Sequence, residues 1–545
     1  MAEVNIIFSM KSYVFLLLFL VLFHSLPAQE KLSYHDIRTD ARGHIKPWNE
    51  DDPGTAFDDV ISRVWNFWDT MRTDINGLPY YMNHMVWTPG LDDARGLGGD
   101  QLQMALSSWQ WLYAYSGNER VKQNMKFIAD YYLGHSLTPA GCLWPSLPFS
   151  YNTLVFSGTY DGDMILGPGF LQPDKAGSFA LELIHLHKMC SRDMAFESTA
   201  ARYLDAAITI ARSLAAHIQP GDHDHSPLPF KVNVFTGEST PLSIYTSNWS
   251  GTMELFLALK DLDPGHAQVY QHGFQVLLEW MRAWPLQNNR WGPFFEDVPG
   301  WSDTQINAVT FARFIMEHKN YFPDWQKQVS GIFDWVYKTL GNDTWKKYGV
   351  IVVNEQSAYH APGQSHSSRQ AAAELLYCSL SHDTTRKTNA IRQLIWSTYM
   401  VDGSGRNRYP KDEIWLTDGY GDYIRHFLRS MAAFPELAPP ASDHILSSSS
   451  VIQSVDYAGQ ANKFLLTEVK DEEISRLRVF YRAYDSAGTE TIRMKRKPAV
   501  LLLDGKTMRE EKESRLEGYQ WTPLGQGGGV LFIHRSSGIA VSVLD

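Results

Sequence analysis

Apolar positions between residues 55 and 434 recur at the three- and four-residue spacing of amphipathic helices. Six stretches share a further pattern, in which a polar loop with glycine or proline leads through a small or polar residue into a strongly apolar helix. These predicted helices cover residues 96–115, 171–189, 246–259, 299–318, 362–380 and 416–434. Short acceptor side chains that can cap free backbone amides lie near their starts: Asp100, Asp174, Asn248, Asp303, Ser365 and Asp418.

Each of the first five apolar helices is followed by a second helix with one apolar face. In the first of these, Val121, Met125, Ile128 and Tyr132 recur at helical spacing. The others cover residues 196–218, 266–284, 324–340 and 384–400, and a helix at 55–72 precedes the whole set. Six inner and six outer helices are the number that closes an (α/α)6 toroid. An open solenoid is the alternative, but loops of uneven length favour closure, because solenoid repeats keep a fixed period.

The pattern changes to a period of two beyond Pro435. Residues 476–484, 499–505, 529–535 and 539–545 alternate as half-buried strands do. We therefore expect a mainly α fold, with an (α/α)6 toroid of six helical hairpins at residues 29–440 and a small antiparallel β-sandwich at 441–545. We favour a structural cap over a carbohydrate-binding module for the sandwich, because no aromatic platform can be placed on one of its faces.

The chain begins with a targeting segment. Residues 14–23 form an uninterrupted apolar run, and His24-Ser25-Leu26-Pro27-Ala28 follows it. This run is shorter than the roughly 20 residues of a membrane span, so it predicts a signal peptide at residues 1–28. We expect an exported protein, periplasmic or secreted, without membrane contact after cleavage. An uncleaved N-terminal anchor is the alternative, and a translation start at Met10 would give a more usual basic n-region.

Composition narrows the class of partner. The chain has 60 acidic and 49 basic residues without basic blocks, which argues against nucleic acid. Cys142, Cys190 and Cys378 are too few and too far apart for a disulfide framework or a zinc cluster, and we expect no metal and no cofactor. The 18 Trp and 26 Tyr offer flat rings on which sugars pack, so they indicate carbohydrate, although a core of large residues is the alternative.

Candidate catalytic acids lie in the loops before the inner helices, which converge at one end of a toroid. Glycoside hydrolysis usually needs two carboxyl groups that flank the scissile bond. Glu296 and Asp297 lie in an aromatic loop, where burial against rings would raise a carboxyl pKa towards general-acid duty, and Glu355 lies in the next long loop. Helix capping or pairing with Arg is the alternative role for each acid.

The same loops hold the candidate substrate-binding residues. Arg can hold a carboxylate in a bidentate pair, so positive charge at the loop face of a net acidic protein indicates an acidic sugar such as a uronic acid. A solvated surface is the alternative. The predicted binding set is Arg95, Asp161, Trp249, Trp301, Tyr359, His360, His366, Arg369 and Tyr420.

Three segments contribute to a family resemblance: PGLDDARGLGGDQ at residues 89–101, GPFFEDVPGWSD at 292–303 and LTDGYGDYIRHF at 416–427. With them, the layout resembles bacterial exported (α/α)6 carbohydrate-active enzymes with a C-terminal β-sandwich, most like the β-glucuronidase-type glycoside hydrolases. The resemblance covers most of the chain after residue 28 in architecture. It implies an exo-acting hydrolase that releases a terminal uronic acid from an oligo- or polysaccharide, and it assigns no role to single residues.

Two other functions stay open at this point. A polysaccharide lyase would cleave beside a uronate by taking its C5 proton with Tyr or His while Arg or Asn neutralises the carboxylate. The fifth loop could supply that set from Asn354, Tyr359, His360 and His366. A glycan-binding toroid without catalysis is the other alternative, in which the aromatic residues would matter and the acids would be dispensable.

Overall fold

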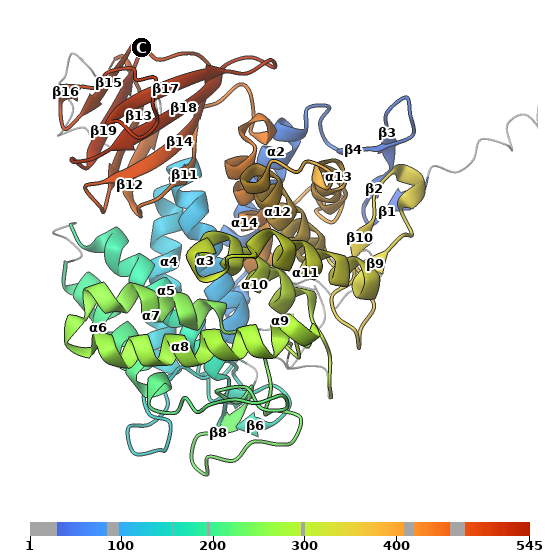
Figure 1. Cartoon of the computed structure of the whole chain (residues 1–545), viewed down its shortest axis with the longest axis vertical. Coiled ribbons are helices and arrows are strands. Elements are labelled where there is room, and N and C mark those ends of the chain that lie inside the picture. Colours follow the sequence, from blue (N-terminus) through green and yellow to red (C-terminus); the bar gives the residue numbers. More distant parts are fainter. Residues whose placement is uncertain are drawn as a thin grey trace, which may run out of the picture.

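The computed structural model describes residues 30–83, 98–154, 156–192, 197–295, 300–407, 419–457 and 475–545. The predicted signal peptide lies outside these ranges and stays a prediction. Within them, no helix is both long and apolar enough to cross a membrane. Helices make up the body of the molecule, and the longer strands gather at one end of it (Figure 1). The predicted mainly helical fold class is therefore confirmed.

Alternate helices of the described chain contact one another in a closed ring. Each ring helix contacts the next one, and the last contacts the first, with α7 and α10 approaching each other least. In ring order the helices are α3 (Gly98–Ser116), α5 (Pro173–Cys190), α7 (Ser250–Leu262), α10 (Gln305–Glu317), α12 (Gln364–Ser381) and α14 (Tyr420–Ala433). All six coincide with the predicted inner helices to within a few residues at each end.

The intervening helices lie outside this ring. Each packs against the ring helix that precedes it, except the first, which packs against α14. They are α2 (Pro53–Asp69), α4 (Glu119–His135), α6 (Glu197–Ala215), α8 (Ala267–Ala283), α11 (Trp325–Leu340) and α13 (Lys387–Thr398), and a short α9 (Pro285–Asn288) follows α8.

Burial differs between the two sets of helices for a simple geometric reason. An outer helix needs one apolar stripe, and α11 buries Val329, Ile332, Phe333, Val336 and Leu340. A ring helix is surrounded, so nearly every residue of α12 from Gln364 to Cys378 is buried. Close approach within the ring requires glycine: a Cβ on Gly421 of α14 would lie 2.2 Å from the carbonyl oxygen of Gln101 in α3.

The C-terminal region holds two antiparallel sheets. One has the order β11-β14-β18-β17 and the other β12-β13-β19-β15-β16. The predicted strands correspond to β13 (Leu477–Ala483), β15 (Val500–Leu503), β18 (Gly529–Arg535) and β19 (Ala540–Leu544). Five further strands had not been predicted: β11 (His444–Ser448), β12 (Ile452–Tyr457), β14 (Gly488–Met494), β16 (Lys506–Thr507) and β17 (Gly518–Pro523).

Side chains of this region bind the C-terminal ends of two ring helices. The last carbonyls of an α-helix lack partners within the helix. Tyr457 Oη donates to the carbonyl of Ala114 at the end of α3 over 2.6 Å, and Gln453 Nε2 donates to that of Lys188 at the end of α5 over 2.7 Å. These contacts are those of a structural cap on the ring.

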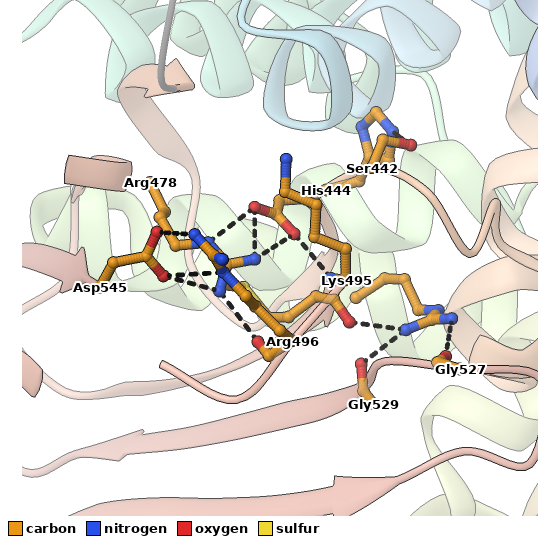
Figure 2. Close-up of polar contacts among 11 residues, drawn as sticks. Ser442, His444, Arg478, Lys495, Arg496, Gly527, Gly529 and Asp545 are labelled. Atoms are coloured by element: carbon orange, nitrogen blue, oxygen red, sulfur yellow. Dashed lines mark hydrogen bonds and ion pairs between the residues drawn. The ribbon is translucent and has the colours of Figure 1, made fainter. Parts of the chain in front are cut away.

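A buried network fixes the segment that joins the helices to the sheets (Figure 2). Arg478 donates to both carboxylate oxygens of Asp443, each over 2.7 Å, and to the carbonyl of Arg496 over 2.9 Å. The Asp443 carboxylate also accepts the backbone N–H of Lys495 over 2.7 Å. The Arg478 side chain is only 3% exposed, so these bonds hold the start of β11 in a fixed place against α3.

Candidate functional site

The described loops before α5, α7, α10 and α12 contact one another in pairs, and we call the surface that they form the loop face. The loop before α5 pairs with the loop before α7, through β7 (Phe170–Leu171) and β8 (Val232–Asn233). The loop before α10 meets the loop before α12, where Ser357 N–H donates to the carbonyl of Asp303 over 2.9 Å. This loop face is therefore where distant parts of the sequence meet.

Glu355 is the one candidate catalytic acid that the structure describes. Glu296 and Asp297 lie outside the described residues. Glu355 is 5% exposed, and its Oε1 accepts a hydrogen bond from Gln356 Nε2 over 2.8 Å. Its backbone carbonyl accepts the N–H of Gln305, the first residue of α10, over 3.0 Å. Glu355 therefore sits against the start of a ring helix, and its catalytic role stays a prediction.

The two predicted substrate-binding tryptophans occupy different environments. Trp301 is 41% exposed, and its Nε1 donates to Asp303 Oδ2 over 3.0 Å. The guanidinium of Arg290 lies 4.1 Å from the centroid of the Trp301 ring. Trp301 is thus an exposed ring held in one orientation, as a sugar-stacking surface requires. Trp249 is fully buried with its Nε1 bonded to the carbonyl of Thr246, so its packing is that of a core residue.

The remaining predicted binding residues of the loops are scattered. Asp161 Oδ1 accepts from both the N–H and the hydroxyl of Thr153, each over 2.9 Å, which shapes its own turn. Tyr359 is half-buried and His360 is exposed in the loop that carries Glu355. Arg95 lies outside the described residues, as does the side chain of Tyr420 at the start of α14.

A buried cluster of charged and imidazole groups lies at the first turns of α12 and α14. Arg369 Nη1 donates to Gln305 Oε1 over 2.9 Å, and its Nη2 pairs with the carboxylate of Asp422. Asp422 also pairs with Arg425 and lies 3.1 Å from Nε2 of His426. The cluster brings α10, α12 and α14 together around one carboxylate.

The two histidines of this cluster are held neutral. His366 and His426 are each 1% exposed. Burial lowers the pKa of both imidazoles well below the usual range, and the charge of Arg369 lowers both further. A neutral imidazole has a lone pair that can hold a hydroxyl or take a proton, but the lowered pKa makes each ring a weaker base than a solvent-exposed histidine.

The sequence analysis missed most of this cluster. It included His366 and Arg369 as binding candidates, but Arg425 and His426 had no role. Asp422, Arg425 and His426 stand at i, i+3 and i+4, which places them on one side of a helix, and this spacing was the available signal.

Asp174 was predicted to cap a helix, but the structure gives it tertiary partners. It lies within the first turn of α5, and its Oδ2 accepts from Lys175 Nζ over 3.1 Å and from Asn248 Nδ2 over 2.8 Å. Lys175 Nζ also donates to the carbonyl of Phe294 over 3.0 Å and lies over the ring of that residue. This contact fixes Phe294, at the edge of the aromatic loop, over the ring axis.

Fold and site together define a closed ring of helix pairs with buried charge on its axis and aromatic loops at one end. No family model and no curated protein matches the sequence. Among solved structures, the chain is similar to a D-mannose isomerase with 11% identity and a TM-score of 0.50, over 70% of this chain and 97% of that one. It is also similar to the cellobiose 2-epimerase of Bacillus thermoamylovorans B4167 with 12% identity and a TM-score of 0.50, over 68% and 97%. At such identities the likeness shows the fold alone.

Proposed function

We propose that the protein is an exported, exo-acting glycoside hydrolase that releases a terminal uronic acid from oligo- or polysaccharides. In this proposal the six helix pairs form an (α/α)6 toroid, the C-terminal sheets form a β-sandwich, and the loop face binds the sugar. The observation that carries the proposal is the pair of buried guanidinium groups of Arg369 and Arg425, which lie side by side on Asp422 beneath that face. Such a pair supplies the positive potential that a sugar carboxylate requires.

The chemistry needs two carboxyl groups on either side of the scissile bond. Glu355 supplies one, and Glu296 or Asp297 supplies the other from the neighbouring loop. One carboxylic acid protonates the leaving oxygen, and the other carboxylate attacks the anomeric carbon or activates water. Trp301 stacks on a sugar ring at the edge of the face. A carboxyl separation of about 5–5.5 Å would predict retention of configuration, and about 6.5–9.5 Å would predict inversion.

The test is incubation of the purified mature protein with glucuronate- and galacturonate-terminated oligosaccharides, with free monosaccharide and ultraviolet absorbance followed together. Free uronic acid without absorbance supports the hydrolase. Rising absorbance reports the double bond of a lyase product and overturns it. The absence of both free uronic acid and absorbance would favour the glycan-binding toroid.

Variants identify the acids once activity is seen. Glu296→Gln, Asp297→Asn and Glu355→Gln are expected to lower kcat by about a hundredfold or more where the acid takes part in proton transfer. Glu513→Gln is the matched control, because Glu513 is exposed in the loop between β16 and β17 and pairs only with Arg515 among the described residues. Full activity in all three variants would refute the carboxylate mechanism.

A second candidate is a sugar isomerase or epimerase. The specific observation is the pair of buried, neutral histidines, His366 and His426, in a fold shared with proteins named as a D-mannose isomerase and a cellobiose 2-epimerase. Both reactions need a base that removes a proton beside a carbonyl. Incubation with D-mannose or cellobiose in deuterated water checks this function. An isomerase would place deuterium at C1 of the ketose formed from D-mannose, and a 2-epimerase would place it at C2 of the epimerised sugar. Either result would replace the hydrolase with this function, and unchanged sugars would exclude these two substrates.

A further inference from the structure

A chamber of about 480 Å³ lies on the axis of the helix ring. On its loop side it is bounded by Met104, Phe294 and Ile306, which form a small apolar cluster separate from the main core. On the opposite side it is bounded by residues 447–451, the turn that joins β11 to β12. The chamber therefore lies between the aromatic loop and the sheets, deeper in the ring than Glu355 and Trp301.

Four arginines of three helices line this chamber: Arg313 of α10, Arg369 of α12, and Arg425 and Arg429 of α14. Burial lowers the pKa of the Arg429 guanidinium, and the positive charges of Arg313 and Arg425 lower it further. Arg425 and Arg429 are only partly exposed, so their like charges repel one another more strongly than they would on an open surface. Their presence in a stable fold therefore calls for negative charge among them.

Only some of these arginines form an ion pair with a carboxylate of the described chain. Arg313 Nη2 pairs with Glu317 Oε1 over 2.7 Å, and Arg425 pairs with Asp422. Arg429 makes no hydrogen bond or ion pair within the described ranges, where its nearest aromatic neighbour is the ring of Trp111 at 5.8 Å. Its Nε is buried without a partner among those residues. Arg429 is thus a cation whose counterion is not one of the surrounding carboxylates.

The acids that face the chamber are already engaged elsewhere. Glu182 Oε2 bonds His185 over 2.9 Å, and Glu254 Oε1 bonds His318 over 2.6 Å. Glu182 and Glu317 attract Arg429 only from beyond hydrogen-bond distance. The side chains of Glu254 and Glu317 are 31% and 41% exposed and so lie towards solvent. The positive charge of Arg429 in the chamber is therefore not neutralised by these acids.

We propose that this chamber binds a small oxyanion, held by the guanidinium of Arg429 with Arg313 and Arg425 beside it. Guanidinium groups bind the paired oxygens of phosphate, sulfate or carboxylate through parallel N–H donors. The oxyanion is a free inorganic anion or the carboxylate of a sugar acid, which share this chemistry. The proposal shares Arg425 with the proposed hydrolase, but it does not rest on that function, because the chamber and the unpaired Arg429 are observed whether or not the protein cleaves sugars.

The test is thermal unfolding of the purified mature protein with sodium phosphate, sodium sulfate or sodium D-glucuronate, each compared with sodium chloride at matched ionic strength. We expect a saturable rise in Tm with at least one of the three, because a ligand that binds only the folded state stabilises it. A response to phosphate and sulfate identifies an inorganic anion, and a response to glucuronate alone identifies a sugar carboxylate. No saturable rise beyond that in chloride with any of them overturns the proposal.

Variants locate the anion. Arg429→Gln should weaken the apparent Kd by about tenfold or more, because it removes the unpaired guanidinium. Arg515→Gln is the matched control, since Arg515 is 82% exposed in the loop between β16 and β17, and it should leave Kd unchanged. An Arg429→Gln protein with unaltered affinity would place the anion elsewhere and overturn the assignment.

A measurement on the unaltered protein covers the case in which Arg429→Gln does not fold. Crystals soaked in sodium selenate are expected to show an anomalous peak within hydrogen-bond distance of the Arg429 guanidinium. Peaks confined to other places would overturn the proposal. Sugar hydrolysis is not measured in any of these experiments, so their failure and the failure of the proposed function are distinguishable.

Discussion

The stability of this protein should depend on the protonation of Glu374, a fully buried carboxyl on α12. Its Oε1 accepts from Gln370 Nε2 over 3.0 Å, and its Oε2 accepts from Tyr337 Oη over 3.2 Å. Arg386 Nη1 lies 3.6 Å away. Burial raises the pKa of Glu374 from 4.5 to about 7, because these partners offset only part of the cost of burying the charge.

The direction of the pH dependence follows from that raised pKa. The folded state holds the proton more tightly than the unfolded state, so the stabilising contribution is fully present below pH 4.5. It is lost as the pH rises through about 7. The difference between 4.5 and about 7 corresponds to about 3 kcal/mol of unfolding free energy, at roughly 1.4 kcal/mol for each pH unit.

The assay is urea denaturation of the wild type and of Glu374→Gln between about pH 4.5 and about pH 8. The neutral side chain cannot ionise, so the stability of the variant relative to the wild type should rise by about 3 kcal/mol across this window. Asp334→Asn is the control, because Asp334 also pairs with Arg386 but is 69% exposed. A stability difference between wild type and Glu374→Gln that stays constant over the window would refute the reasoning.

Three further predictions concern the loop face, the cap and the ring. Trp301→Ala should raise KM for oligosaccharides about tenfold, and Trp301→Phe should raise it less because a ring remains; an unchanged KM would exclude stacking. Tyr457→Phe should lower the free energy of unfolding in urea by about 1 kcal/mol, because it leaves the carbonyl of Ala114 at the end of α3 without its donor. Gly421→Ala should lower that free energy by about 2 kcal/mol or more, since its Cβ would force α14 away from α3. Gly331→Ala on α11, where nothing lies within 4 Å of the added Cβ, should instead raise it by about 0.5–1 kcal/mol.

The helices were the most predictable part of the fold, and their caps were the least. The repeated pattern of a polar loop that leads into an apolar stretch placed all six ring helices, because a helix surrounded by others must be apolar over most of its surface. Several of the side chains predicted to cap these helices instead bond partners outside their own helix. Asn248 donates to Asp174 across the ring, and Asp303 Oδ1 accepts the backbone N–H groups of Trp291 and Gly292. At a crowded loop face, tertiary partners compete with the local amide, and local spacing does not reveal them.

The candidate site was predictable to the extent that it follows from topology. Loops that precede ring helices meet on one face, so Glu355 and Trp301 were correctly placed near the starts of ring helices. The ion pair between Arg369 and Asp422 joins α12 to α14, and no short-range spacing indicates it. For the same reason the chamber around Arg429 could not be foreseen, since its walls come from all six ring helices of the described chain and from the sheets.

The unpredicted strands illustrate the same limit in the sheets. β14 reads GTETIRM, with charges that look like those of an exposed loop. Yet Glu490 and Arg493 are fully buried, and Glu490 pairs with Arg535 over 2.7 Å. Arg493 donates to the carbonyls of Gly527 and Gly529, which another part of the chain supplies (Figure 2). Period-two reasoning counts apolar side chains, so it fails wherever a buried charge is matched by a partner distant in sequence. The ring axis and the sheets share this property, and Arg429 differs because the described chain supplies no such match.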